Sequence, residues 1–132
     1  MRSLKLAAVA IVFAALSACT ATVQNFSNQP FPSDVEKLSM EEIEATIIEA
    51  ASARDWIVQR EGEGHLKATY APRSHSAEVA ISFDKKNYSI IYVDSTNLNY
   101  NGTQIHRNYN RWVNNLRQDI LRAVSARAAL AN

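Results

Sequence analysis

Residues 77–94 read AEVAISFDKKNYSIIYVD, two apolar runs joined by the polar turn Asp84-Lys85-Lys86-Asn87. Both runs alternate between larger apolar and smaller or polar residues, which is typical of an antiparallel β-hairpin. Pairing Phe83 with Tyr88 across the turn brings six side chains onto one face: Val79, Ile81, Phe83, Tyr88, Ile90 and Tyr92. We predict that this face is the core side of a sheet. The other face has mixed polarity and carries Glu78, Ala80, Ser82, Ser89, Ile91 and Val93.

Two further extended segments precede the hairpin, at residues 56–61 and 65–70. Gly62-Glu63-Gly64 separates them and supplies residues that tolerate a tight turn, while Pro72 lies in the connection to residue 77. The sequence therefore predicts four strands, at residues 56–61, 65–70, 77–83 and 88–94, in an antiparallel meander.

A helix is predicted on either side of these strands. Ser39 and Glu42 form a capping-box pattern, so we expect the first helix to begin at residue 39 and to end near Arg54. The second begins at Gln104, capped by Thr103 or Asn101, and has the strongest apolar stripe of the chain: Ile105, Tyr109, Trp112, Val113, Leu116, Ile120, Ala123 and Val124. Arg127 returns to this stripe, so we expect the last residues to fray.

The predicted fold is therefore α+β in the order α-β-β-β-β-α, with both helices packed on one face of a four-stranded sheet. Residues 34–49 are predominantly acidic, whereas residues 107–127 carry five arginines against Asp119. Helices of opposite charge can lie side by side, although surface ion pairs contribute only about 0 to 1 kcal/mol each. Trp56 and Trp112 lie within apolar patterns, and we interpret both as core residues.

The N-terminus carries export features. Arg2 and Lys5 precede an uncharged apolar run, residues 6–16, which is too short for a membrane-spanning helix but typical of a signal peptide. Leu16-Ser17-Ala18-Cys19 follows, and Cys19 is the single cysteine of the chain. We interpret residues 1–18 as a signal peptide, residues 19–38 as a flexible tether because they lack periodicity, and residues 39–132 as one domain.

The quartet ending at Cys19 resembles the lipobox of bacterial lipoproteins, and the whole chain resembles small proteobacterial outer-membrane lipoproteins without an assigned activity. The resemblance implies that the Cys19 thiol is acylated with fatty acids such as palmitate and anchors the protein in the membrane. Thr20 stands where an Asp would retain such a protein at the inner membrane, so we expect a lipid anchor in the outer membrane of the cell envelope, with the domain facing the periplasm. An ordinary signal peptide with an incidental cysteine is the alternative.

The length and net charge of the chain limit the classes of partner that it can bind. The chain has 132 residues and a formal net charge of +1, and loss of Arg2 and Lys5 with the signal leaves a balance of about −1. A nearly neutral chain of this size is one small domain with no general attraction for nucleic acid.

Catalytic and metal-binding signatures are absent from the sequence. The histidines, His65, His75 and His106, lack the spacing of a metal site, and neither a GxSxG elbow nor a phosphate-binding glycine loop occurs. We therefore predict no cofactor, no metal and no enzymatic activity. Residues 94–103 are rich in amides and hydroxyls, which either form a turn or bind a ligand.

Three functions remain as hypotheses. The leading one is a non-catalytic envelope module that binds a protein or accessory component of the outer membrane through the sheet face around Ile91 and Val93. The alternative is a carbohydrate or peptidoglycan binder that uses Arg73, Tyr100, Asn101 and His106. The third, a hydrolase, requires His75, Asp94 and His106 to converge around a cleft, because acid–base catalysis needs hydrogen-bond contact, directly or through one water.

Overall fold

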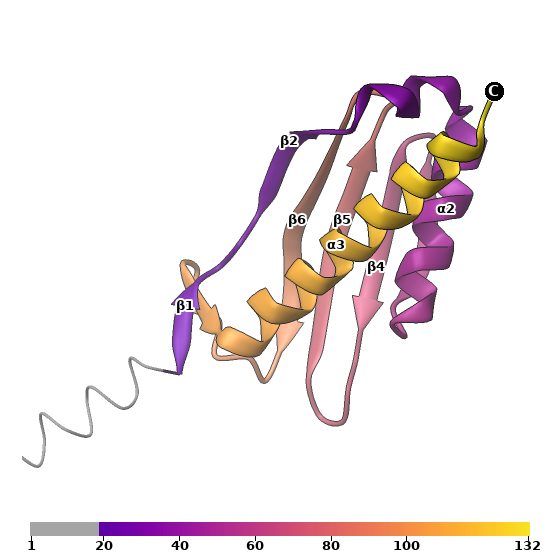
Figure 1. Ribbon diagram of the computed structural model, residues 1–132. Coiled ribbons are helices and arrows are strands. Elements are labelled where there is room, and N and C mark those ends of the chain that lie inside the picture. The colour runs from indigo at the N-terminus through magenta and orange to yellow at the C-terminus, as the bar shows by residue number, and fades with distance from the viewer. Residues whose placement is uncertain (1–18) are drawn as a thin grey trace, which may run out of the picture.

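The computed structural model describes residues 19–132 as an α+β fold, in which an antiparallel sheet carries two helices on one face (Figure 1). The predicted signal peptide and the lipobox positions before Cys19 lie outside the described residues. The elements are, in chain order, β1 (Thr20–Thr22), β2 (Phe26–Pro30), the 3-10 helix η1 (Ser33–Lys37), α2 (Met40–Ala53), β3 (Ile57–Gly62), β4 (His65–Tyr70), β5 (Ser76–Phe83), β6 (Asn87–Thr96), β7 (Gln104–His106) and α3 (Arg107–Leu130).

The central hairpin has the predicted register. Phe83 pairs with Tyr88, Ile81 with Ile90 and Val79 with Tyr92 across β5 and β6. The carboxylate of Asp84 holds the turn, because Oδ1 accepts hydrogen bonds of 2.7 Å from the backbone N–H groups of Lys86 and Asn87. The strand order β6-β5-β4-β3 confirms the predicted antiparallel meander.

A fifth strand corrects the predicted four-stranded sheet. β2 pairs antiparallel with β6 and forms the outer edge of the order β2-β6-β5-β4-β3, and a separate two-stranded sheet joins β1 to β7. The sequence of β2 does not alternate regularly between apolar and polar residues, because the register of β2 against β6 shifts between Phe26 and Gln29. The strand also ends in Pro30, which an edge strand tolerates.

Residues 20–38 therefore belong to the folded domain and are not the flexible tether that the sequence predicted. Four apolar side chains of this segment are buried: Phe26, Phe31, Val35 and Leu38. The ring of Phe31 lies 5.0 Å from that of Tyr88, and the guanidinium of Arg117 from α3 lies 4.9 Å from the centre of the Phe26 ring. The domain boundary predicted at residue 39 moves to the beginning of the described chain.

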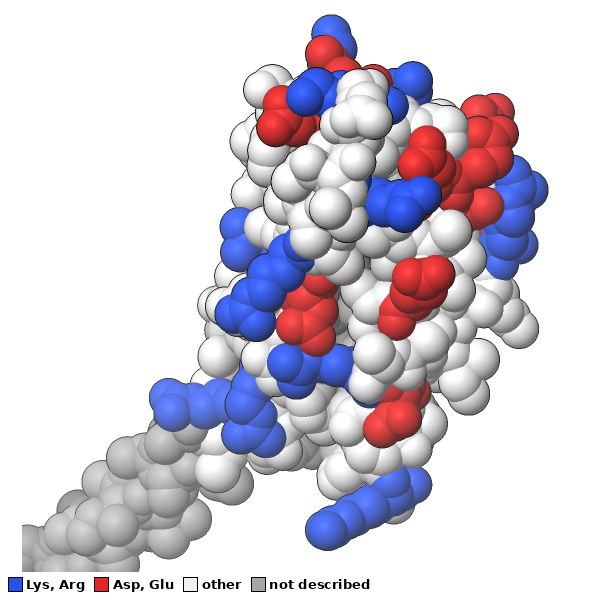
Figure 2. Space-filling view, turned by 45° about the vertical axis from the view of Figure 1, so that its right-hand side comes forward, with Lys and Arg blue, Asp and Glu red and all other residues white. Residues whose placement is uncertain are grey.

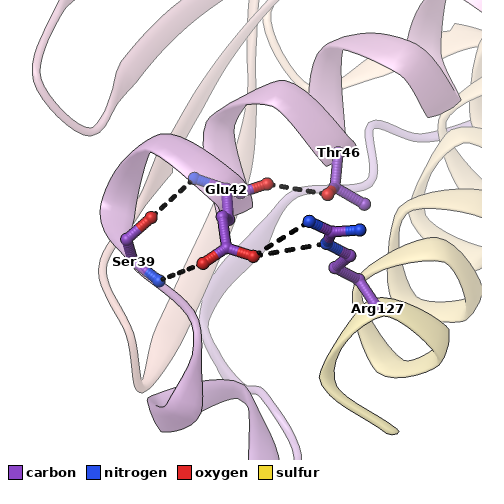
Figure 3. Close-up of polar contacts among 4 residues, drawn as sticks. All are labelled: Ser39, Glu42, Thr46 and Arg127. Atoms are coloured by element: carbon purple, nitrogen blue, oxygen red, sulfur yellow. Dashed lines mark hydrogen bonds and ion pairs between the residues drawn. The ribbon is translucent and has the colours of Figure 1, made fainter. Parts of the chain in front are cut away.

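The start of α2 follows the predicted capping box. Ser39 Oγ accepts from the Glu42 N–H at 3.1 Å, and Glu42 Oε1 accepts from the Ser39 N–H at 3.3 Å (Figure 3). The second carboxylate oxygen, Oε2, lies 3.2 Å from a guanidinium nitrogen of Arg127 in α3. The predicted frayed end is therefore wrong: α3 continues to Leu130, and Arg127 joins the oppositely charged helices.

The predicted start of the second helix is also corrected. Gln104–His106 is not helical but forms β7, whose backbone pairs with β1. α3 begins at Arg107, and its cap is His106 rather than Thr103 or Asn101: the Nδ1 atom of His106 accepts from the Asn108 N–H at 3.1 Å.

The core lies between the helices and one face of the sheet. α3 crosses this face diagonally and packs beside α2 (Figure 1). Arg60 on β3 forms an ion pair of 3.0 Å with Glu44 on α2. The buried side chains of the two helices are Ile43, Ile47, Ala51, Tyr109, Val113, Leu116, Ile120, Val124 and Ala128. Because both helices occupy one face, the opposite face of β3 to β6 has no covering helix within residues 19–132.

Candidate functional site

The open face of the sheet carries apolar side chains that reach solvent. Val93 is 48% exposed and Ile57 is 69% exposed, Ala80 is exposed, and Ile91 is half-buried. A β-bulge explains the position of Val93: Glu78 opposes Asp94 and Val79 opposes Tyr92, so that Val93 is the extra residue of β6. The predicted mixed face is therefore present at the surface, and we call it the open sheet face.

Strand register gives this surface its pattern. One row across the sheet joins Lys67, Ala80 and Ile91, and the next joins Thr69, Glu78 and Asp94. The apolar positions of β5 and β6 thus lie side by side, whereas charged residues lie along their border.

A depression of about 470 Å³ lies on the open sheet face. Ala80 and Val93 supply its apolar side chains, whereas the side chains of Leu66 and Ile81 are buried on the core face beneath it. Polar residues surround it: Glu61, His65, Lys67, Glu78 and Ser82. Lys67 Nζ lies 3.7 Å from a carboxylate oxygen of Glu61 at the edge. An apolar centre with a polar rim is the arrangement of a protein-binding surface.

The loop residues singled out in the sequence make internal contacts. Asn101 Oδ1 accepts from the backbone N–H groups of Thr103 and Gln104, at 3.0 and 2.8 Å. Tyr100 donates its hydroxyl to the Gly102 carbonyl at 3.2 Å, and its ring lies 4.2 Å from that of Tyr92. Together with the capping role of His106, these bonds shape the turn that leads into α3.

The structure does not bring the remaining candidates into one cluster of hydrogen bonds. His75 Nδ1 lies 3.0 Å from the carbonyl of Asn97, whereas Asp94 Oδ1 accepts from the Ser95 N–H at 2.8 Å. In the register of β5 and β6, Ser76 lies opposite Thr96 and Glu78 opposite Asp94, so that His75 adjoins Asn97 beyond the paired residues. Arg73 is exposed in the connection between β4 and β5, with a positive φ of 58°.

An aromatic groove, which the sequence did not predict, lies at the C-terminal end of α2. The Tyr70 ring lies 5.4 Å from that of Trp56 and 5.0 Å, edge to face, from that of Trp112. The groove has a volume of about 320 Å³ and is completed by Ala53, Arg54, Asp55 and Asn115. Arg54 pairs with Asp119 of α3.

The two tryptophans differ in burial. Trp56 is buried, as expected for a core residue, whereas Trp112 is half-buried and lines the groove. Trp112, Asn115 and Asp119 recur at helical spacing, which is the signal for a shared helix face. The groove residues of α2 and β4, such as Ala53 and Tyr70, are brought beside this helix face only by the tertiary fold, which no sequence spacing reveals.

Between residues 19 and 132, no group of three or more His, Cys, Asp or Glu side chains is placed to hold a metal ion. No helix within the same residues is both long and apolar enough to cross a bilayer.

Comparisons with protein-family models, with curated proteins and with solved structures found no significant match to this chain.

Proposed function

We propose that the protein is a non-catalytic module of the cell envelope, held in the outer membrane by acylated Cys19, which binds a protein partner in the periplasm through the open sheet face. The observation that carries this proposal is the 470 Å³ depression on the open sheet face, in which the apolar side chains of Val93 and Ala80 lie inside a polar rim. Cys19 itself is exposed, at the very beginning of the folded domain.

The hydrophobic free energy gained by covering the open sheet face favours binding of a partner there. Covering apolar surface contributes about 25 cal/mol per Å², and complete burial of a fully exposed large aliphatic side chain contributes roughly 1.5 to 3 kcal/mol. Val93 is 48% exposed and Ile91 is half-buried, so each can add about half of that or less. Val93, Ile91 and Ala80 lie together on β5 and β6, while Ile57 adds a further apolar side chain on the edge strand β3. Charged side chains around them, such as Lys67 and Glu78, can select the partner.

The test replaces Ile91 and Val93 together with lysine in the full-length protein. Because Val93 is exposed and Ile91 only half-buried, we expect the variant to fold with little change in thermal midpoint. Cross-linking in intact cells followed by mass spectrometry should show at least one protein partner of the wild type that the variant loses. The matched control places lysines on exposed positions of α2, Ala45→Lys and Ser52→Lys, and retains the partner. An unchanged set of cross-links in the Ile91/Val93 variant would contradict the proposal.

A carbohydrate is the second candidate ligand, and the aromatic groove favours it. Aromatic faces such as Trp112 and Tyr70 provide apolar contact, while Arg54, Asp119 and Asn115 provide polar groups near the same cavity. We expect Trp112→Ala to reduce co-sedimentation with purified peptidoglycan, with Leu130→Ala on the same helix as the control. If the wild type does not sediment with peptidoglycan, the cell-wall function is eliminated.

A further inference from the structure

The lipid-bearing residue adjoins the folded domain without a spacer. Thr20, the next residue, already pairs with His106 in the β1–β7 sheet. The carbonyl oxygen of Cys19 accepts a hydrogen bond of 3.2 Å from the backbone N–H of Arg107, the first residue of α3. Acyl chains on Cys19 would therefore hold this end of the domain at the membrane surface.

Side chains of α3 fasten the segment that follows Cys19. Asn110 accepts from the Gln24 N–H at 3.0 Å and donates to the Thr22 carbonyl at 2.9 Å. Asn114 donates to the Gln24 side-chain carbonyl at 2.6 Å, and the Val23 N–H donates to the Thr103 carbonyl at 2.9 Å. Bonds on two sides of the segment prevent it from acting as a free hinge.

The surface beside Cys19 suits a phospholipid headgroup layer. Arg107 and Arg111 are exposed one helical turn apart at the start of α3. Figure 2 shows basic side chains gathered where the described chain begins. Tyr100, in the loop that leads to β7, is 41% exposed, and tyrosine is enriched at membrane–water interfaces. Asp94, at the end of β6, is exposed at the same end of the sheet.

Charges of both signs occupy the opposite end, where Lys37 pairs with Asp34, Lys86 with Glu36 and Arg127 with Glu42. The first turns of η1 and α2 contain Asp34, Glu36, Glu41 and Glu42, and Asp84 lies in the turn between β5 and β6. This turn is separated from Thr96 by the whole of β6, which at about 3.3 Å per residue amounts to roughly 30 Å. The domain thus has a basic end beside the anchor, whereas acidic and basic side chains largely offset one another at the remote end.

We propose that this end of the domain, formed by Cys19, Arg107, Arg111 and residues 97–103, docks on the anionic phospholipid surface in one fixed orientation. The inference rests on the proposed acylation of Cys19. Each basic side chain near an anionic surface favours contact about fivefold, so the two arginines add to the lipid anchor and orient the domain. The strands then extend away from the bilayer, and the open sheet face remains accessible to a periplasmic partner.

The test measures depth in the membrane with a fluorophore on a single introduced cysteine. Full-length protein, produced in cells that acylate it, carries either Thr103→Cys or Lys85→Cys and is reconstituted into vesicles of phosphatidylethanolamine and phosphatidylglycerol. A nitroxide on the lipid headgroup quenches fluorophores that lie close to the surface. We expect strong quenching at position 103 and little at position 85, and a weaker effect at position 103 when Arg107→Gln and Arg111→Gln are added or when phosphatidylcholine replaces the anionic mixture.

The outcomes separate the two proposals. Failure of acylation is recognised independently, because the otherwise wild-type chain would then react with a maleimide at Cys19 and would not float with the vesicles. Equal quenching at positions 103 and 85 in protein that floats would overturn the fixed orientation and leave the anchor intact. Quenching at position 103 that is indifferent to both arginines would overturn their role in docking.

Discussion

Among the described residues, Tyr109 has a buried side-chain hydroxyl that makes no hydrogen bond. Its side chain is fully buried at the start of α3, edge to face with Tyr92 at 5.5 Å, and its hydroxyl has no hydrogen-bond partner within residues 19–132. Burial raises the pKa of Tyr109 far above its ordinary value. A buried hydroxyl without a partner costs about 1 to 3 kcal/mol, so the phenol is a local cost of filling the core with an aromatic ring.

Replacing Tyr109 with phenylalanine should therefore stabilise the protein, by about 1 kcal/mol at pH 7. The benefit should grow above about pH 10, because tyrosine ionises in the unfolded chain there while Tyr109 stays protonated in the folded one, which lowers the stability of the wild type alone. Urea unfolding followed by circular dichroism at neutral and alkaline pH measures both effects. The control is Tyr88→Phe, which should destabilise, since the Tyr88 hydroxyl accepts from Arg117 Nε at 2.9 Å. A loss of stability in Tyr109→Phe would show that the hydroxyl is satisfied in solution.

At the scale of elements, the join between α2 and α3 depends on ionised Glu42. Its pKa is lowered, first by the hydrogen bond from the Ser39 backbone and then by Arg127. A lowered folded-state pKa means that this stabilisation is present above the pKa of Glu42 in the unfolded chain and is lost as the pH falls through the folded-state value. Glu42→Gln should therefore lower the unfolding midpoint at pH 7 and match the wild type in acid. Glu41→Gln, in the same helical turn, should change little, and an equal effect of both variants would contradict the assignment to Glu42.

Elements were predictable from the sequence where their pattern is local. The register of β5 and β6 follows from two-residue alternation, and the start of α2 follows from the Ser39–Glu42 spacing. β1 and β7 are three residues long and pair across most of the chain, so no local period marks them. Ile105 fits a helical stripe as well as it fits a buried strand position, and only the pairing partner decides between them.

The same distinction holds for the candidate surfaces of the whole molecule. Ile91 and Val93 were predicted on the second face of the hairpin because alternation alone assigns that face. The aromatic groove could not be predicted, because Trp56 lies in the connection between α2 and β3, Tyr70 on β4 and Trp112 on α3, and no sequence period encodes how these segments pack. The basic end beside Cys19 was also hidden, since residues 20–38 read as a tether that would have separated Arg107 from the anchor.

The contribution of residues 20–38 to the domain can be tested by measuring the stability of the whole chain with and without them. The segment contributes Phe26, Phe31, Val35 and Leu38 to the core, and each is worth roughly 1.5 to 3 kcal/mol when fully buried. Their sum is comparable to the entire stability of a domain, about 5 to 15 kcal/mol. We therefore expect a chain without residues 20–38 to lose cooperative thermal unfolding and resistance to proteolysis.

The matched control for this deletion changes only exposed side chains of the same segment, Ser27→Ala, Ser33→Ala and Lys37→Ala, and should unfold close to the wild-type midpoint. Deletion removes the partner strand of β6 and the ring that packs on Tyr88, so the loss should extend to the β5–β6 hairpin, which amide hydrogen exchange measures directly. A deletion chain that keeps the wild-type midpoint and hairpin protection would show that residues 20–38 are dispensable and that a tether separates the anchor from the domain after all.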